Sequence, residues 1–310
     1  MKKLICLLLC LCLLTACTPM QKESSENSKL KIVATLFPQF DFAREIAGDK
    51  ANISLLLPPG AESHSYEPSP ADIMTIAEAD LFIYTGDAME AWVSPVLDAL
   101  EDGPYILDIT QDIDLSAGGH ETVHETAQDE ARHSHDVDPH VFTNPRFARK
   151  MATTLCAALT QLDPENAAIY EANAAKLDAS LAALDQSFKA VTENAARNKV
   201  IFGGRFPFAY FVEAYGLSYD AAYDSCSSES EPAAGDVARL IDTVRAENIP
   251  VVFYEELANP KTALLICEET GAKPLLLHSC HNISKEDFEN GVSYLSLMQT
   301  NVEHLKEALG

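Results

Sequence analysis

The feature that most constrains the fold is an alternation of short apolar runs with amphipathic stretches, which recurs in both halves of the chain. Strands are predicted at residues 32–36, 53–57, 81–84, 105–107, 200–202, 250–254 and 274–277. Helices are predicted at residues 40–47, 89–100, 208–215, 233–246, 262–270 and 294–309, with a further helix starting near Ser69-Pro70. Strands that alternate with helices indicate βαβ units, so we expect an α/β fold with mainly parallel sheets.

Between the two halves lies one long helical pattern. It opens at Asp163-Pro164 and runs to about Ala195, with apolar residues mostly three or four positions apart. A helix of about 30 residues is about 45 Å long, which exceeds the width of one small lobe. The pattern therefore predicts a helix that spans both halves.

The charge balance excludes some partners. The 310 residues include 22 Lys and Arg against 47 Asp and Glu, which gives a formal net charge of -25. Such a surface repels phosphate backbones and anionic membrane faces, so we expect no nucleic-acid partner. It attracts cations, although most acidic proteins bind no metal.

The N-terminus predicts export. Lys2 and Lys3 precede the apolar run Leu4 to Leu14, which is too short to span a membrane and is typical of a signal peptide. Leu14-Thr15-Ala16-Cys17 resembles a lipobox, which predicts a signal peptide at 1–16, lipidation of Cys17 and a flexible tether at 17–29. The alternative is a signal peptide with an incidental cysteine. We expect an extracytoplasmic protein that is attached to the cell membrane only by lipid.

Four of the eight cysteines remain once the signal segment and Cys17 are set aside. Disulfides persist outside the cytoplasm, and four cysteines allow three pairings. Cys156 and Cys267 lie in apolar helical patterns that are typical of buried thiols. Cys226 and Cys280 lie in loops, and we predict a disulfide between them.

The segment 118–138 lacks the periodicity of a core-forming element. It holds six carboxylates and the histidines His120, His124, His133 and His135. We predict a solvated loop that collects metal weakly, because ordering a flexible chain costs entropy. The alternative is an ordinary solvated loop.

Candidate metal ligands follow or flank the predicted strands. His64 lies after the second strand, His140 lies before a helix, and His278 and His281 follow the last strand. Ligands bind beyond the strand ends of open α/β sheets, and neutral imidazole suits Zn²⁺. The chain has no GxGxxG, Walker A or GxSxG motif, which argues against common nucleotide enzymes and serine hydrolases.

Several segments in fixed order resemble one family. They include Pro58-Pro59-Gly60 with His64-Ser65-Tyr66-Glu67-Pro68, Ala79 to Tyr84 with Gly86, Asp138-Pro139-His140-Val141, Tyr210-Phe211, Glu231-Pro232 and Tyr294-Leu295. From Leu30 to Gly310 the chain is similar to the solute-binding lipoproteins of the zinc and manganese class of ABC importers. Each segment is a weak signal alone, and their order and spacing make a strong one.

The resemblance implies two α/β lobes, at 30–162 and 197–310, joined by one long rigid helix at 163–196. It implies a metal site in the cleft between the lobes, with His64 and His140 as ligands from the N-terminal lobe. The third family ligand corresponds here to Arg205, which cannot ligate a cation. The fourth falls at His278 or His281, so the C-terminal half of the ligand set differs from the family pattern.

We predict that His64 and His140 bind Zn²⁺ together with His278, His281 or both, and that affinity falls as the pH drops through about 6.5. Glu229 and Glu231 are the leading additional oxygen donors, and Arg205 is expected to hold a carboxylate near the metal. Imidazole ligands favour Zn²⁺ over Mn²⁺.

The predicted function is that of a monomeric, non-enzymatic capture protein that delivers the ion to an ABC-transporter permease. The alternatives are a surface adhesin stabilised by metal and a secreted zinc hydrolase with Glu67 or Glu255 as general base.

Overall fold

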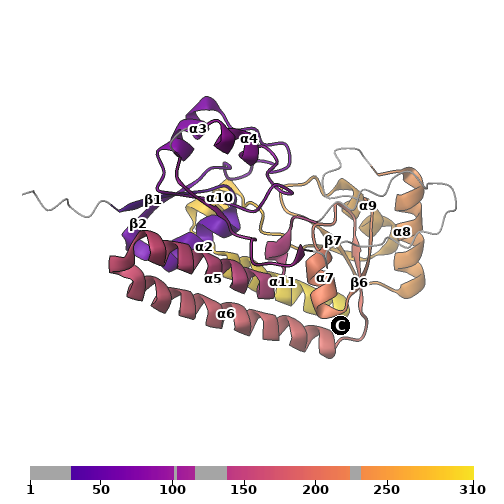
Figure 1. The fold of residues 1–310 in the computed structure, drawn as a ribbon. Helices are drawn as coiled ribbons and strands as arrows, with labels where there is room; N and C mark the ends of the chain where they lie inside the picture. Colours follow the sequence, from indigo (N-terminus) through magenta and orange to yellow (C-terminus); the bar gives the residue numbers. More distant parts are fainter. Residues whose placement is uncertain (1–28, 101–102, 116–137, 224–231) are drawn as a thin grey trace, which may run out of the picture.

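Two four-stranded sheets form the centres of two lobes (Figure 1). The computed structural model describes residues 29–100, 103–115, 138–223 and 232–310. The first sheet has the order β2-β1-β3-β4, with β1 at Leu30–Ala34, β2 at Ala51–Leu55, β3 at Leu81–Tyr84 and β4 at Tyr105–Asp108. The second has the order β6-β5-β7-β8, with β5 at Lys199–Phe202, β6 at Ser218–Ala221, β7 at Val251–Tyr254 and β8 at Lys273–Leu276.

Every strand pair within both sheets is parallel, which confirms the predicted sheet class. The sequence prediction missed β6. Ser218 and Asp220 make β6 polar, and it lies at the edge of its sheet, so it lacks the apolar run that marks a buried strand.

Helices pack around both sheets. Those of the first half are α2 at Phe37–Ala47, α3 at Pro70–Ala77, α4 at Val93–Asp98 and α5 at Pro145–Leu162. Those of the second half are α7 at Ala209–Tyr215, α8 at Ala234–Glu247, α9 at Lys261–Thr270, α10 at Lys285–Glu289 and α11 at Tyr294–Leu309. Within the described residues, no helix is both long and apolar enough to cross a membrane.

The long central helix, α6, occupies Ala167–Glu193 and follows a 3₁₀ turn at Pro164–Asn166. Its 27 residues make it about 40 Å long. Leu177, Leu181 and Phe188 on one face are buried, and the helix contacts α2 and α5 as well as α7 and α11. Figure 1 shows it running beneath both lobes, so the predicted spanning helix is confirmed.

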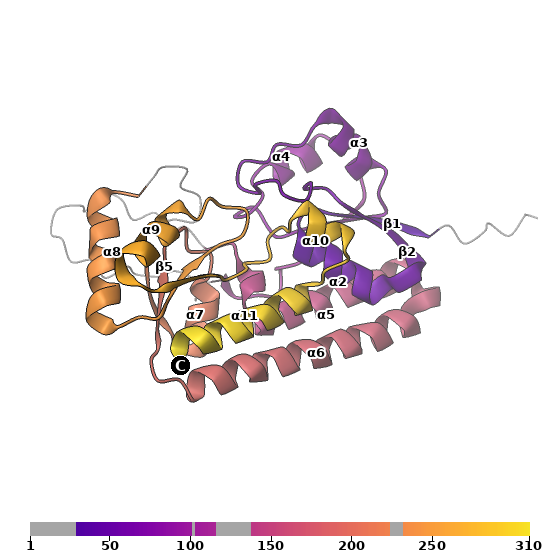
Figure 2. The same cartoon turned by 180° about the vertical axis from the view of Figure 1, so that it is seen from behind.

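The end of the chain returns to the N-terminal lobe before it finishes beside the second sheet (Figure 2). The Gly60 N–H donates to the Ile283 carbonyl at 2.8 Å, and the Tyr294 N–H donates to Asp41 Oδ2 at 2.8 Å. From there α11 runs along α6 towards β5, β7 and β8. Residues 281–294 therefore contact the lobe opposite to the one that the sequence assigned them to.

The strand order determines where loops can form a site. In each sheet the chain order reverses beside the first strand, between β1 and β3 and again between β5 and β7. Loops that leave neighbouring strands at such a reversal diverge and open a crevice where ligands bind. The segment after β5 contains Arg205, and Glu255 follows β7 directly.

Candidate metal centre

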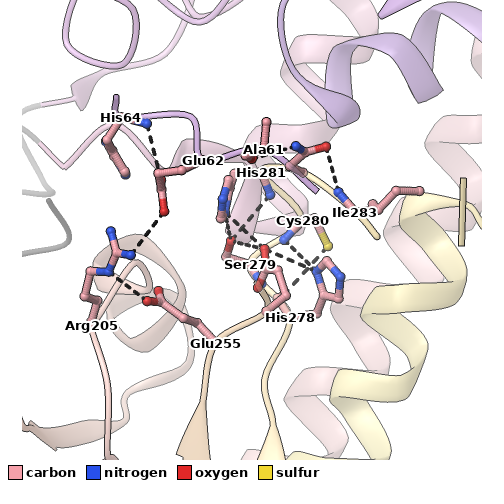
Figure 3. Close-up of polar contacts among 12 residues, drawn as sticks. Ala61, Glu62, His64, Arg205, Glu255, His278, Ser279, Cys280, His281 and Ile283 are labelled. Carbon is pink, nitrogen blue, oxygen red and sulfur yellow. Dashed lines mark hydrogen bonds and ion pairs between the residues drawn. The ribbon is translucent and has the colours of Figure 1, made fainter. Parts of the chain in front are cut away.

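Three of the predicted histidines come together between the lobes. The ring centres of His64 and His140 are 5.2 Å apart, and the ring of His281 lies 6.5 Å from His64 and 6.3 Å from His140. A small cavity is lined by these three side chains together with Glu62, Arg205, Glu255 and Glu256. Figure 3 shows Glu62 and His64 facing Arg205 and Glu255 across this space.

His140 is held rigidly by Asp138. Asp138 Oδ1 lies 2.7 Å from the His140 Nδ1 atom and accepts the His140 backbone N–H at 2.9 Å. The other oxygen of Asp138 accepts the backbone N–H of Ala209, at the start of α7, at 3.2 Å. Because Nδ1 is used in this contact, the ring is oriented so that Nε2 is the nitrogen for a metal.

His281 has a similar carboxylate behind it. Its Nδ1 lies 2.7 Å from Ser279 Oγ and 3.0 Å from Glu256 Oε1. Its carbonyl oxygen accepts the Phe37 N–H at 3.3 Å, which fixes the backbone of this residue against the N-terminal lobe. Its Nε2 atom is buried and has no hydrogen-bond partner among the described residues.

The electrostatic environment keeps the imidazole of His64 neutral. Burial, reinforced by the neighbouring His140, lowers the pKa of His64 from 6.5 to about 4. Burial alone would raise the pKa of Glu256, but His278 and His281 outweigh it and hold that pKa far below its ordinary value. Glu256 is therefore an ionised carboxylate that accepts hydrogen bonds from Ser279 and contacts His281.

The second carboxylate at the end of β7, Glu255, behaves differently. Burial raises its pKa from 4.5 to about 7, although Arg205 opposes that shift. Arg205 Nε lies 3.0 Å from Glu255 Oε1, and Arg205 Nη2 lies 3.1 Å from Glu62 Oε2. The contact between Arg205 and Glu255 is an ion pair without hydrogen-bond geometry. Glu255 Oε1 accepts no hydrogen bond from the described residues. The arginine does contact carboxylates that line the cavity, as the sequence suggested.

The structure does not bring His278 to the cavity. The Cys280 N–H donates to His278 Nδ1 at 3.0 Å, and Asn301 binds the backbone N–H and carbonyl of His278. These contacts direct the ring towards α11 and away from His64 and Arg205 (Figure 3). Of the two C-terminal candidates, only His281 lines the cavity.

Other predicted residues lie outside the described part of the chain. These are Cys17, His120, His124, His133, His135, Cys226, Glu229 and Glu231. Cys280 is fully buried and has a free thiol, and Cys156 and Cys267 also have free thiols. The structure therefore gives Cys280 as a free thiol. Cys226 lies outside the described residues, so the Cys226–Cys280 disulfide stays a prediction.

The distances between the three imidazole rings fit a zinc site once His281 moves slightly. With Zn–N bonds of about 2.1 Å and tetrahedral angles, coordinated imidazole ring centres lie about 5 Å apart. His64 and His140 already have this separation, whereas His281 stands about 1 Å too far from each. In the described part of the chain, no three side chains are yet close enough together to hold a metal ion. Binding therefore requires His281 and a carboxylate to move towards the other two rings.

Sequence reasoning missed Glu62, Asp138 and Glu256. Asp138 is two residues from His140, and Glu62 is two residues from His64. Carboxylates so close to candidate ligands could have been considered as supporting groups. Glu256 follows β7 at the crevice of the second sheet, a position that the strand prediction already indicated.

Two α/β lobes with imidazoles and carboxylates in the cleft define a cation-binding protein of the two-lobed, solute-binding class. Residues 32–308 match the protein-family model described as zinc-uptake complex component A, periplasmic. The chain belongs to this family.

Named relatives agree with this assignment. The chain is 32% identical over 304 residues to the high-affinity zinc uptake system protein ZnuA of Bacillus subtilis, covering 97% of this chain and 95% of that protein. It is 33% identical over 312 residues to the zinc-binding lipoprotein AdcA of Streptococcus pneumoniae, where it covers 99% of this chain but 61% of AdcA.

Solved structures have the same fold. The metal-dependent lipoprotein YcdH of Bacillus subtilis aligns with a TM-score of 0.77 and 30% identity, covering 91% of this chain and 99% of that one. The Zn(II)-bound ZnuA-like domain of Streptococcus pneumoniae AdcA aligns with a TM-score of 0.76 and 31% identity, with the same coverage.

Proposed function

We propose that this protein binds one Zn²⁺ ion between its lobes and delivers it to the membrane permease of an ABC importer. The ligands are the imidazoles of His64, His140 and His281 and the carboxylate of Glu255. The protein is a capture protein and performs no chemical reaction on the ion.

The observation that carries the proposal is the buried Nε2 atom of His281, which has no hydrogen-bond partner among the described residues. A buried polar atom without a partner is costly, about 1–3 kcal/mol. Its Nδ1 contacts Ser279 and Glu256, so the Nε2 lone pair is directed at the cavity that His64 and His140 also line. A zinc ion would satisfy this atom.

Glu255 is the better fourth donor of the two carboxylates that follow β7. Glu256 already accepts hydrogen bonds from Ser279 and lies behind His281, so its role is to orient that imidazole. Glu255 lines the same cavity, and its Oε1 accepts no hydrogen bond from the described residues. Three imidazoles and one carboxylate match the tetrahedral preference of zinc, whereas Mn²⁺ prefers oxygen-rich octahedral sites.

The alternative functions lack support from the site. A zinc hydrolase needs an open coordination position and a general base. Glu67 is exposed and does not line the cavity, and Glu255 is paired with Arg205. No described feature favours an adhesin. We propose further that the protein is a monomer anchored through Cys17, and that Glu229, Glu231 and the histidines between His120 and His135 bind zinc only weakly.

The test uses purified mature protein stripped of metal with a chelator. Competitive titration against a chromophoric zinc chelator should give one ion per chain with Kd well below micromolar, or at least about 8 kcal/mol of binding free energy. Manganese should bind at least tenfold more weakly. Binding of less than one equivalent, or steady hydrolysis of ester and peptide substrates by the zinc-loaded protein, would contradict the proposal.

A further inference from the structure

The guanidinium of Arg205 lies inside the metal cavity itself. Arg205 follows β5 in the segment Gly203-Gly204-Arg205, and its side chain is 20% exposed. A Cβ atom at position 203 would lie 2.4 Å from the Cα of Ala263 in α9. Only glycine at position 203 therefore allows the backbone to approach the helix this closely. This close approach positions the segment that carries Arg205 beside β7 and the two carboxylates that follow it.

Arg205 connects the two lobes in the absence of metal. One nitrogen contacts Glu255 of the C-terminal lobe at 3.0 Å, and another contacts Glu62 of the N-terminal lobe at 3.1 Å. The arginine thus supplies positive charge between buried or half-buried carboxylates that would otherwise repel each other. Figure 3 shows this bridge directly below His64.

Zinc would have to compete with this bridge for the same oxygen. Arginine keeps its proton at every accessible pH, so its charge cannot be removed when a metal arrives. A Zn–O bond is about 2.0–2.2 Å long, which would place the ion close to a guanidinium nitrogen that stays 3.0 Å from Glu255 Oε1. Two cations so close together repel each other strongly in a site with little water.

We propose that Arg205 is a built-in competitor for zinc, which pairs with Glu255 in the metal-free protein and releases that carboxylate when zinc binds. The inference rests on the proposed zinc function and on Glu255 as a ligand. Arg205 keeps its contact with Glu62 throughout. When zinc leaves, the guanidinium returns to Glu255, so the arginine lowers the affinity and speeds the release of the ion.

The experiment compares Arg205→Gln with Arg149→Gln, which removes the same charge from an ion pair with Asp178 on α5 and α6. Zinc affinity is measured at pH 8 by chelator competition, and release by stopped-flow transfer to excess chelator. We expect Arg205→Gln to bind zinc about tenfold more tightly and release it more slowly, and Arg149→Gln to match the wild type. A tenfold gain corresponds to about 1.4 kcal/mol.

Two further readouts separate competition from a merely structural role. Arg205→Lys keeps the charge and should stay within about threefold of wild-type affinity. The metal-free Arg205→Gln protein should melt at a lower temperature than the metal-free wild type, and zinc should raise its melting temperature by more. Arg205→Leu, which also removes the charge and adds no metal donor, serves as a second variant and should bind more tightly too.

The outcomes distinguish this inference from the function on which it rests. If the wild type binds one zinc tightly but neither Arg205→Gln nor Arg205→Leu binds more tightly, the competitor role is wrong and the capture function stands. If the wild type itself does not bind zinc, both are wrong.

Discussion

The two sheets have the same strand order, yet the crevice at the reversal of each order has a different content. In the N-terminal lobe, Glu90 is 2% exposed and accepts the Thr85 N–H at 2.6 Å and the Thr35 hydroxyl. In the C-terminal lobe, Glu255 and Glu256 line an inter-lobe cavity with Arg205. One crevice is filled by its own lobe, and the other faces its neighbour.

This difference shows that topology provides a place for a site without determining its chemistry. Burial raises the pKa of Glu90 to about 8, so at neutral pH it is a neutral acid that hydrogen-bonds within the lobe. Gln39 and Thr85 complete the same cluster. The N-terminal lobe instead presents its two histidines from segments outside this crevice, after β2 and before α5.

The largest expected effect on zinc affinity comes from removing the two imidazole ligands of the N-terminal lobe. His64→Ala and His140→Ala should each weaken zinc binding at least tenfold, about 1.4 kcal/mol, because each removes a ligand. Chelator competition measures the loss. His304→Ala is the control, since its ring contacts the Leu276 carbonyl at 2.7 Å, away from the cavity. Unchanged affinity in both variants would refute the site.

A second prediction concerns pH and the carboxylate side of the site. The pKa of Glu255 is raised to about 7, and zinc must displace its proton, so affinity should fall about tenfold per pH unit below 7. The pKa of His64 is about 4, so that ring stays neutral and adds no proton competition until the pH approaches 4. The expectation of a fall through 6.5 set by histidine therefore does not apply to His64.

Glu255→Gln is the variant that checks this assignment. It should bind zinc more weakly at pH 8. Between pH 5.5 and 7, its zinc affinity should depend less steeply on pH than that of the wild type, because zinc displaces one proton fewer. Zinc titrations across that pH range measure the slope. A slope identical to that of the wild type would assign the proton to another group.

A third prediction concerns Glu90, which is buried in the crevice of the N-terminal lobe. The pKa of Glu90 is about 8 in the folded protein against 4.5 as its ordinary value, so the folded state binds the extra proton between these values. The free energy of unfolding should therefore fall as the pH rises from 4.5 to 8 and then level off. Glu90→Gln removes this loss and should be about 1–3 kcal/mol more stable than the wild type at pH 9.

Urea unfolding of the metal-free proteins at pH 5 and pH 9 provides the measurement. The two proteins should differ little at pH 5, where Glu90 is protonated. A wild type that is as stable as Glu90→Gln at pH 9 would show that Glu90 ionises without cost.

The smallest effect is expected from the histidine-rich segment. Deletion of residues 118–137 should leave tight one-to-one zinc binding within about threefold and lower uptake only when zinc is scarce. The deletion must spare Asp138, because this residue holds the His140 ring and backbone. Loss of tight binding in the deletion variant would make the segment a primary ligand.

The sequence predicted the features that depend on local patterns. Apolar runs identified seven of the eight strands that the structure describes, and the three- and four-residue spacing identified α6. His64 and His140 were predicted from their loops and from the family resemblance. These features follow from periodicity and turn chemistry, which a single segment carries by itself.

The rest depends on contacts between distant segments. Whether His278 or His281 faces the cavity is decided by Asn301 on α11, which binds the backbone of His278, and by Phe37, which binds His281. The pairing of Arg205 with Glu62 joins residues 143 positions apart. No spacing rule connects such positions, so only the folded chain shows them.

The most direct test of the account is a crystal structure of the zinc-loaded protein with anomalous diffraction at the zinc edge. We predict one zinc ion bound by the Nε2 atoms of His64, His140 and His281 and by a Glu255 oxygen, with Arg205 still paired with Glu62 but no longer with Glu255. A zinc ion bound by His278 or Glu256 in place of His281 or Glu255, or a guanidinium still paired with a metal-bound Glu255, would contradict it.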